Sequence, residues 1–259
     1  MAAILSTPAA PLAGKVALVT GGAGGLGAEI CRELAALGAS VVVGYHSSAD
    51  AARGLAAALP VAGAAGHCAL AAPVTDSAAL AGLAHDIGAR HGRCDILVNC
   101  AGITSFVPHD DLDGLDDDLI DNILATNVRG PFAVVRALRP LLAASGDALV
   151  VNVSSIAAVT ATGSNVMYCA SKAALDNMTR SLARALAPAI RVVSVAPGLA
   201  DTDFVKALDR AWRDRQADRT PLRRLAAPRD VALAVVALAT HLTFTTGAVI
   251  PVDGGRPLR

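Results

Sequence analysis

The sequence lacks an excess of charge of either sign. Its 22 lysines and arginines equal its 22 aspartates and glutamates, so the formal net charge at pH 7 is zero. A protein without a global positive field has no general attraction for nucleic acid or for an anionic membrane surface. We therefore expect neither a nucleic-acid partner nor a membrane partner.

Cysteine is sparse and irregularly spaced. The chain has five cysteines, an odd number, and no two of them form a C-x-x-C pair. This pattern is not typical of a disulfide framework or of a zinc site, and it favours reduced thiols in a cytoplasmic protein. The cysteines are Cys31, Cys68, Cys94, Cys100 and Cys169.

Clustered metal ligands are also scarce. Seven aspartates lie between Pro108 and Asp121. A calcium-binding loop would need carboxylates where His109 and Ile120 stand. We interpret the aspartates as a solvated turn before the next helix, and we expect no metal site.

Long hydrophobic runs are missing. The most apolar internal stretch, Val231 to Thr240, has 10 residues, whereas a membrane-spanning helix needs roughly 20. Residues 1–13 carry no basic region of the kind that begins a signal peptide. We expect a flexible leader at 1–13 and a single catalytic domain at 14–259.

The sequence does contain a regular alternation of short apolar strands and helical stretches. Lys15 to Thr20 is an almost continuous β-branched and aliphatic run that ends in glycines, which is typical of a strand buried on both faces of a parallel sheet. The alternation predicts an α/β, Rossmann-type doubly wound parallel sheet with helices on both faces. The other predicted elements are strands at Ser40–Val43, Ile96–Val98, Ala148–Val153, Ile190–Val195 and Gly247–Val252, and helices at Ala28–Leu37 and Ala78–Arg90.

A glycine-rich loop follows the first predicted strand. Five of the eight residues from Thr20 to Gly27 are glycines, and a helix is predicted from Ala28 onward. Glycines let the backbone approach a pyrophosphate closely, and the N–H groups at the start of the helix stabilise the anion. Because strand, glycines and helix come in the required order, we interpret the loop as a dinucleotide-binding turn.

The residues after the second predicted strand bear on the choice of cofactor. An acidic residue at this position would bind the ribose 2′-hydroxyl of NAD(H) and repel a 2′-phosphate. Tyr45, His46 and Ser47 stand there instead, and the first acid is Asp50. We therefore favour NADP(H) over NAD(H), although no arginine replaces the missing acid.

The chain has two tyrosines, and one of them stands four residues before a lysine. This spacing would put Tyr168 and Lys172 on one face of a helix. A free phenol has a pKa of about 10, so a nearby cation is needed to favour the phenolate at neutral pH. Ser155 precedes Tyr168 by 13 residues and follows a predicted strand, where its hydroxyl could bind a substrate oxygen. Alone, the pair would equally fit a helix-surface contact, and the serine a strand-end cap.

Taken together, these motifs resemble the short-chain dehydrogenase/reductase family, and in particular its 3-oxoacyl-reductase-like and glucose-dehydrogenase-like members. The similarity runs from Gly14 to Gly255. The matching motifs are Thr20-Gly21-x-x-x-Gly25-x-Gly27, Asn99-Cys100-Ala101-Gly102, Asn127, Ser155, Tyr168-x-x-x-Lys172, and Pro197-Gly198 with Thr202.

The resemblance implies roles for these residues. Tyr168 would be the general acid/base, Lys172 would lower its pKa and hold the nicotinamide ribose, Ser155 would orient the substrate oxygen, and Asn127 would anchor a proton relay. The expected cofactor contacts are Gly21, Gly25, Leu26, Gly27, Tyr45, His46, Ser47, Val74, Asn99, Ala101, Gly102, Tyr168, Lys172, Pro197, Gly198 and Thr202.

Three positions depart from the family pattern. Cys100 replaces a second asparagine, and Pro73 precedes Val74 where many members have an aspartate that meets the adenine. Gly24 stands in the glycine loop where NADP(H)-preferring members often carry a basic residue, which weakens the preference for that cofactor.

The resemblance also implies hydride transfer between NAD(P)(H) and a carbonyl or secondary alcohol. A ketone or 3-oxoacyl reductase is the leading interpretation; a sugar or polyol dehydrogenase and a catalytically silent cofactor sensor or scaffold are the alternatives. Similar enzymes are commonly homotetramers. A segment at about 200–226 would cover the substrate, and its arginines would either bind an anionic acyl thioester or form a solvated helix face.

Overall fold

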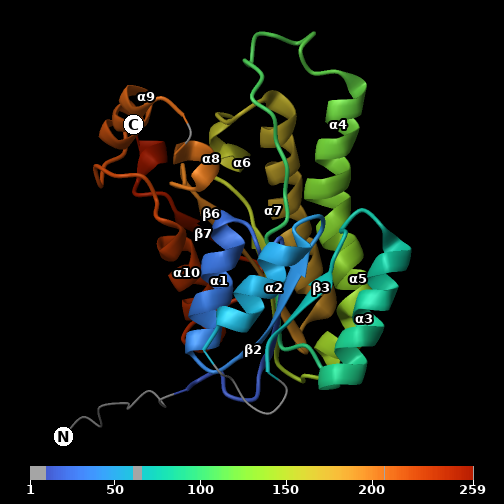
Figure 1. The fold of residues 1–259 in the computed structure, drawn as a ribbon. Helices are drawn as coiled ribbons and strands as arrows, with labels where there is room; N and C mark the ends of the chain where they lie inside the picture. Colours follow the sequence, from blue (N-terminus) through green and yellow to red (C-terminus); the bar gives the residue numbers. More distant parts are fainter. Residues whose placement is uncertain (1–9, 61–65, 207, 259) are drawn as a thin grey trace, which may run out of the picture.

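Seven parallel strands form the centre of the structure (Figure 1). The computed structural model describes residues 10–60, 66–206 and 208–258. The strands are β1 (Val16–Thr20), β2 (Ser40–Tyr45), β3 (Cys68–Ala71), β4 (Ile96–Asn99), β5 (Ala148–Val153), β6 (Ile190–Pro197) and β7 (Val249–Val252). Their order is β3-β2-β1-β4-β5-β6-β7, and every neighbouring pair is parallel. The order reverses beside β1, which confirms the predicted doubly wound sheet.

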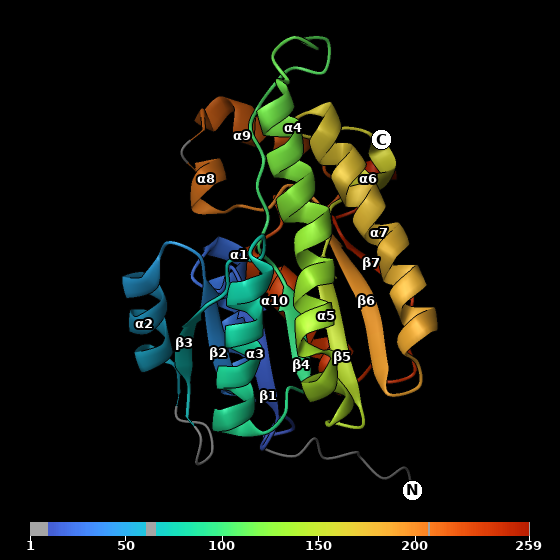
Figure 2. The ribbon, with the colours of Figure 1, turned by 90° about the vertical axis from the view of Figure 1, so that its right-hand side faces the viewer.

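Helices cover both faces of the sheet, as predicted. Helices α1 (Gly25–Ala36) and α10 (Pro228–Thr240) pack on one face, and α3 (Ser77–His91), α5 (Gly130–Ala143) and α7 (Val166–Leu186) pack on the other (Figure 2). None of the described helices is both long and apolar enough to cross a membrane. The remaining helices are α2 (Ala49–Ala58), α4 (Asp117–Leu124), α6 (Ala157–Thr160), α8 (Asp203–Lys206) and α9 (Arg210–Asp218), with a π-helical turn at Ala125–Arg129 and a 3₁₀ turn at Arg256–Leu258.

The strand β1 contributes to two hydrophobic cores, one on each side of the sheet. Ala17 and Val19 belong to the core under α1 and α10, whereas Val16 and Leu18 belong to the core under α3 and α5. Successive side chains of a strand point to opposite faces, so a strand buried on both sides must be apolar at every position. Burial on both faces therefore explains why the β1 segment of the sequence is an unbroken apolar run.

The sequence-based predictions missed one strand and misplaced the start of two other elements by two or three residues; most other boundaries agree to within two residues. Helix α1 begins at Gly25 rather than at Ala28, so the last glycines of the loop are helical residues. Strand β7 begins at Val249 rather than Gly247, because Gly247 has a φ of +71° that does not fit a strand. Strand β3 was not predicted, since its sequence Cys-Ala-Leu-Ala contains no β-branched or aromatic residue.

The part of the predicted leader that the structure describes packs onto the domain. Leu12 is buried, and its N–H donates to the carbonyl of Leu37 at 2.9 Å. The expectation of a flexible segment up to residue 13 is therefore wrong from Leu12 onward, because this side chain adds to the core under α1. Residues 1–9 lie outside the described residues.

A buried carboxylate fixes the amino-terminal edge of the sheet. Asp95 accepts hydrogen bonds from the backbone N–H of Val16 at 2.9 Å and from the hydroxyl of Ser145 at 2.8 Å, and it pairs with Lys15 and Arg93. Its side chain is 1% exposed. Burial alone would raise the pKa of Asp95, but the hydrogen bonds from Val16, Arg93, Ser145 and Lys15 outweigh it and hold the pKa below its ordinary value.

Replacing Asp95 by alanine should destabilise the fold by about 3 kcal/mol, because the N–H of Val16 and the guanidinium of Arg93 would lose their partner. Urea unfolding followed by circular dichroism measures this loss. The pKa of Asp95 in the folded protein lies below its unfolded value of about 3.9. The stabilisation by Asp95 is therefore complete above about pH 3.9 and is lost as the pH falls through the folded pKa.

The matched control for this experiment is Asp147→Ala. The Asp147 side chain is 70% exposed and lies 3.7 Å from Arg191, so its loss should change stability by less than about 0.5 kcal/mol. Equal losses for the two variants at neutral pH would contradict the anchoring role of Asp95.

Candidate active site

The predicted site residues meet at the carboxyl edge of the sheet. In the strand register, Thr20 lies beside Asn99 and Asn99 lies beside Asn152, so the segments that follow β1, β4 and β5 emerge together. Helices α6, α8 and α9 lie beyond this same edge (Figure 2). Ligands of doubly wound sheets bind at this edge, next to the point where the strand order reverses.

The glycine loop is closed so tightly that side chains are excluded from it. A Cβ atom on Gly27 would lie 2.2 Å from the carbonyl oxygen of Gly21, and Gly21 itself has a φ of +63°. Gly24 caps helix α1 without a side-chain hydrogen bond, so backbone N–H groups alone form the start of this helix. The geometry fits a phosphate cradle made of backbone, which is what a dinucleotide pyrophosphate requires.

A hydroxyl and an amide link the glycine loop to the neighbouring strands. Thr20 Oγ1 accepts hydrogen bonds from the N–H groups of Cys100 and Ala101 at 3.1 and 3.2 Å. The amide of Asn99 donates to Asn152 Oδ1 at 2.9 Å, and both side chains are buried. Asn99 therefore joins β4 to β5, and Thr20 joins the start of the glycine loop to the segment after β4.

Asn127 lies in the π-helical turn between α4 and α5. Its Oδ1 accepts from the N–H of Ile103 at 2.8 Å, and its Nδ2 donates to the carbonyl of Ile103 at 2.9 Å. A Cβ atom on Gly102 would lie 3.3 Å from Asn127 Oδ1 and 3.6 Å from Lys172 Nζ. Asn127, Gly102 and Lys172 are therefore immediate neighbours.

Tyr168 and Lys172 project from the first turns of α7. The Nζ of Lys172 lies 5.6 Å from the centre of the Tyr168 ring and donates to the carbonyl of Val153 at 2.9 Å. Ser155 follows β5 and forms a hydrogen bond with the Tyr168 phenol. The structure thus brings together the four residues predicted as a catalytic group, from α7, from the end of β5 and from the π-helical turn.

Burial sets the pKa values of the two titratable groups. Burial raises the pKa of Tyr168 above its ordinary value, and the hydrogen bond with Ser155 opposes this effect. Burial lowers the pKa of Lys172 to about 8, opposed by Cys100 and Asp176. The pKa of Tyr168 is set by burial, by Ser155 and by Cys169, while the Lys172 ammonium donates to a backbone carbonyl. That Lys172 lowers the pKa of the phenol stays a prediction.

The remaining predicted cofactor contacts come from the ends of β2, β3 and β6 and the segments just after them. The Cβ of Thr202 lies 3.2 Å from a Cβ placed on Gly25, so the segment that follows β6 faces the glycine loop. Val74 is buried against Gly130, and Gly198 lies against Asp253. The predicted contacts that follow β2 are Tyr45, which is half-buried, and His46 and Ser47, which are exposed.

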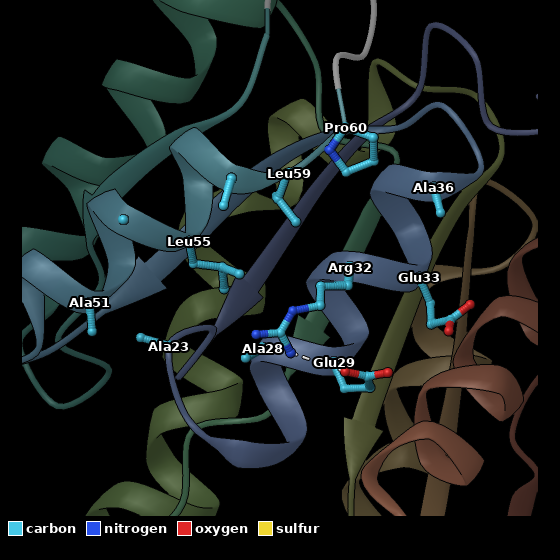
Figure 3. A pocket seen from close by; sticks show the side chains of 12 residues that line it. Ala23, Ala28, Glu29, Arg32, Glu33, Ala36, Ala51, Leu55, Leu59 and Pro60 are labelled. Carbon is cyan, nitrogen blue, oxygen red and sulfur yellow. Dashed lines mark hydrogen bonds and ion pairs between the residues drawn. The ribbon is translucent and has the colours of Figure 1, made fainter.

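A separate groove of about 680 Å³ lies between α1 and α2, and Figure 3 shows its lining. Ala23 joins it to the glycine loop, and Arg32 and Glu29 pair with each other at 3.0 Å along its wall. None of Asn127, Ser155 and Tyr168 lines this groove. It is distinct from the place where the predicted catalytic residues meet.

Known proteins match this chain over nearly its whole length. A family model described as enoyl-(acyl carrier protein) reductase matches residues 21–256. A Streptomyces violaceoruber protein assigned as ketoacyl reductase 2 of the granaticin polyketide synthase is 40% identical over 94% of this chain and 96% of its own length. The chain belongs to the short-chain dehydrogenase/reductase family.

Other family members agree with this assignment. The 3-oxoacyl-[acyl-carrier-protein] reductase FabG of Pseudomonas aeruginosa is 35% identical over 94% of this chain and 98% of its own length. The solved structure of the Pseudomonas aeruginosa RhlG/NADP active-site complex is 31% identical, with a TM-score of 0.88, and covers 96% of this chain and 99% of that one. The predicted enzyme class, an NAD(P)-dependent oxidoreductase, is confirmed.

Replacing Gly27 by alanine should weaken NADPH binding by at least about ten-fold, because the new methyl group would meet the backbone of Gly21 and Gly22 and the cradle would have to open. Titration of NADPH fluorescence measures this effect. The control is Gly82→Ala in α3, where a Cβ meets nothing within 4 Å. This substitution should leave NADPH affinity unchanged and raise the free energy of unfolding by about 0.5–1 kcal/mol. Equal NADPH affinities for the two variants would contradict the steric argument.

Proposed function

We propose that this short-chain reductase uses NADPH to reduce a ketone, and that 3-oxoacyl thioesters are its substrate class. The observation that carries the proposal is the meeting of a half-buried phenol, a serine hydroxyl and a buried lysine beside the backbone cradle. The cradle fits a dinucleotide pyrophosphate, and Gly102 leaves room beside Lys172 and Asn127. When bound, the nicotinamide supplies the hydride.

The residues of the chain would handle the proton and the substrate oxygen. Burial raises the pKa of Tyr168, so the phenol holds its proton at neutral pH and is suited to donating it to a carbonyl oxygen. Ser155, which bonds the phenol, would orient the same oxygen. Lys172, with a pKa of about 8, is predominantly an ammonium at neutral pH and would bind the nicotinamide ribose. Asn127 would anchor the proton relay that returns a proton to Tyr168. The protonated phenol is the form that carbonyl reduction requires, because the carbonyl oxygen must gain a proton.

The preference for NADP(H) rests on the end of β2. His46 and Ser47 are exposed there, and neither would repel a 2′-phosphate. The hydroxyl of Ser47 would donate a hydrogen bond to the phosphate, whereas an acid would be needed to select NAD(H). The NADP complex of the related RhlG supports the same choice.

The proposed reductase would work in the cytoplasm as a homotetramer built on α5 and α7. Four of the apolar side chains on these helices belong to the monomer core: Val134, Val135, Leu138 and Leu175. Phe132, which is 43% exposed, and the exposed alanines Ala173 and Ala174 remain to form a contact between subunits. Sedimentation of the purified protein determines the subunit number.

Replacing Tyr168 by phenylalanine should lower kcat for ketone reduction by about 10³-fold, because the proton donor is removed while the ring is kept. NADPH affinity should stay within about two-fold, since the pyrophosphate cradle is untouched. Absorbance at 340 nm measures the reaction, with NADPH and NADH compared on 3-oxoacyl thioesters, neutral ketones and polyols. If wild type and variant bind NADPH but are equally inert on all substrates, the protein is a cofactor sensor instead.

The arginines of the substrate-covering segment differ in their contacts. Arg213 pairs with Asp201, and Arg224 pairs with Asp230. The Arg210 side chain is 92% exposed, and its Nε lies 4.0 Å from Asp214. Arg210 lines a groove of about 770 Å³ that also includes Arg213 and Arg224. Arg210 is therefore best placed to bind an anionic acyl carrier.

Arg210→Ala should raise the KM for a 3-oxoacyl-CoA by about five-fold, equivalent to about 1 kcal/mol, and leave the KM for a neutral ketone unchanged. The control is Arg53→Ala in α2. The Arg53 side chain is 60% exposed, it pairs with Asp50 at 2.6 Å, and it does not line this groove. The same increase for both substrates, or for both variants, would show that Arg210 does not recognise the anion.

A further inference from the structure

We propose that Asn165 is a positioning residue of this enzyme, one that joins the backbone of Tyr168 to the loop at residues 103–107. The proposal rests on the proposed function, in which Tyr168 donates the proton. Asn165 is fully buried although the loop that it holds is largely exposed. All hydrogen bonds of this buried amide go to two segments of one site, so the amide holds these two segments together in addition to filling space.

The two ends of the Asn165 amide bind two different segments. Its Oδ1 accepts from the N–H of Tyr168 at 2.6 Å, which makes Asn165 the cap of helix α7. Its Nδ2 donates to the carbonyl of Ser105 at 2.7 Å and to Thr104 Oγ1 at 3.3 Å. The amide has one workable orientation, because the N–H of Tyr168 needs an acceptor and the carbonyl of Ser105 needs a donor.

A second connection runs from the other side of the same tyrosine. The hydroxyl of Ser171 donates to the carbonyl of Tyr168 at 2.7 Å and accepts from Asn127 Nδ2 at 3.2 Å. Asn127 in turn binds both backbone groups of Ile103. The N–H and the C=O of Tyr168 are therefore both joined, through two asparagine side chains, to consecutive residues of one loop.

The loop depends on these contacts for its position. Ile103 is 40% exposed and Phe106 is 73% exposed, so the loop buries little apolar surface of its own. The N–H of Val107 donates to the carbonyl of Ser164 at 2.9 Å, beside Asn165 in the sequence. A shift of the loop therefore moves the first turn of α7, and a misplacement of about 1 Å at a reacting group costs up to about 100-fold in rate.

The chain offers variants that separate the two functions of the amide. Asn165→Ala removes both the cap of α7 and the tie to the loop, by which we mean the hydrogen bond from Asn165 Nδ2 to the carbonyl of Ser105. Asn165→Asp keeps an acceptor for the N–H of Tyr168 but has no donor for Ser105. The control is Asp116→Ala in α4, because Asp116 Oδ1 accepts from the N–H of Leu119 at 2.7 Å, the same capping position as in α7.

We expect Asn165→Ala to lower kcat about ten-fold and to raise the KM for the ketone about three-fold. Asn165→Asp should recover most of kcat but keep the raised KM, and Asp116→Ala should change neither value. All three should lower Tm by a few degrees and leave NADPH affinity unchanged. A lower kcat in Asn165→Ala that Asn165→Asp does not restore, or one that Asp116→Ala reproduces, would overturn the proposal.

Hydrogen–deuterium exchange of the full chain tests, independently of activity, whether Asn165 joins the loop at 103–107 to the start of α7. Exchange should rise at both 103–107 and 166–172 in Asn165→Ala, at 103–107 alone in Asn165→Asp, and at neither in Asp116→Ala. Exchange confined to 166–172 in Asn165→Ala would show a simple helix cap and refute the tie. If wild type reduces no ketone but the exchange pattern holds, the proposed function fails and the tie between Asn165 and the loop stands.

Discussion

A buried chain of hydrogen bonds holds helix α7 against the sheet. Asn99 donates to Asn152 at 2.9 Å, Asn152 donates to Thr179 at 2.8 Å, and Thr179 contacts Ser194 at 2.8 Å. These residues come from β4, β5, α7 and β6, so the hydrogen bonds join three neighbouring strands to the helix that carries Tyr168 and Lys172. Polar groups in a core are costly unless they are paired, and a paired series fixes one arrangement of its elements. The positions of the phenol and the lysine relative to the sheet edge depend on this arrangement.

The same burial that orders the site also adjusts its chemistry. Tyr168 keeps its proton because burial raises its pKa, and Ser155 moderates that effect by hydrogen bonding. Lys172 is brought to a pKa of about 8, while its ammonium donates to the backbone at Val153. Desolvation thus moves the pKa values of Tyr168 and Lys172 in opposite directions, upward for the phenol and downward for the ammonium.

The loop at 103–107 is held differently from the glycine loop. The glycine loop is closed by backbone packing, since a Cβ atom on Gly27 would lie 2.2 Å from the carbonyl oxygen of Gly21. The loop at 103–107 is exposed and is held by side-chain amides from Asn127 and Asn165. Backbone packing therefore fixes the glycine loop, whereas side-chain hydrogen bonds fix the loop at 103–107.

The sequence alone determined the parallel sheet and the glycine turn, because apolar runs and the glycines that follow a strand are local patterns. The group of Asn127, Ser155, Tyr168 and Lys172 was predicted only through the resemblance to the family. The sequence did not determine strand β3, which lacks β-branched residues, or the start of α1 at Gly25. An Asn-x-x-Tyr spacing at the start of a helix was a visible capping signal for Asn165, but its second partner at Ser105 is 60 residues away. The raised pKa of Tyr168 also required the tertiary structure, since desolvation depends on which distant segments cover a group.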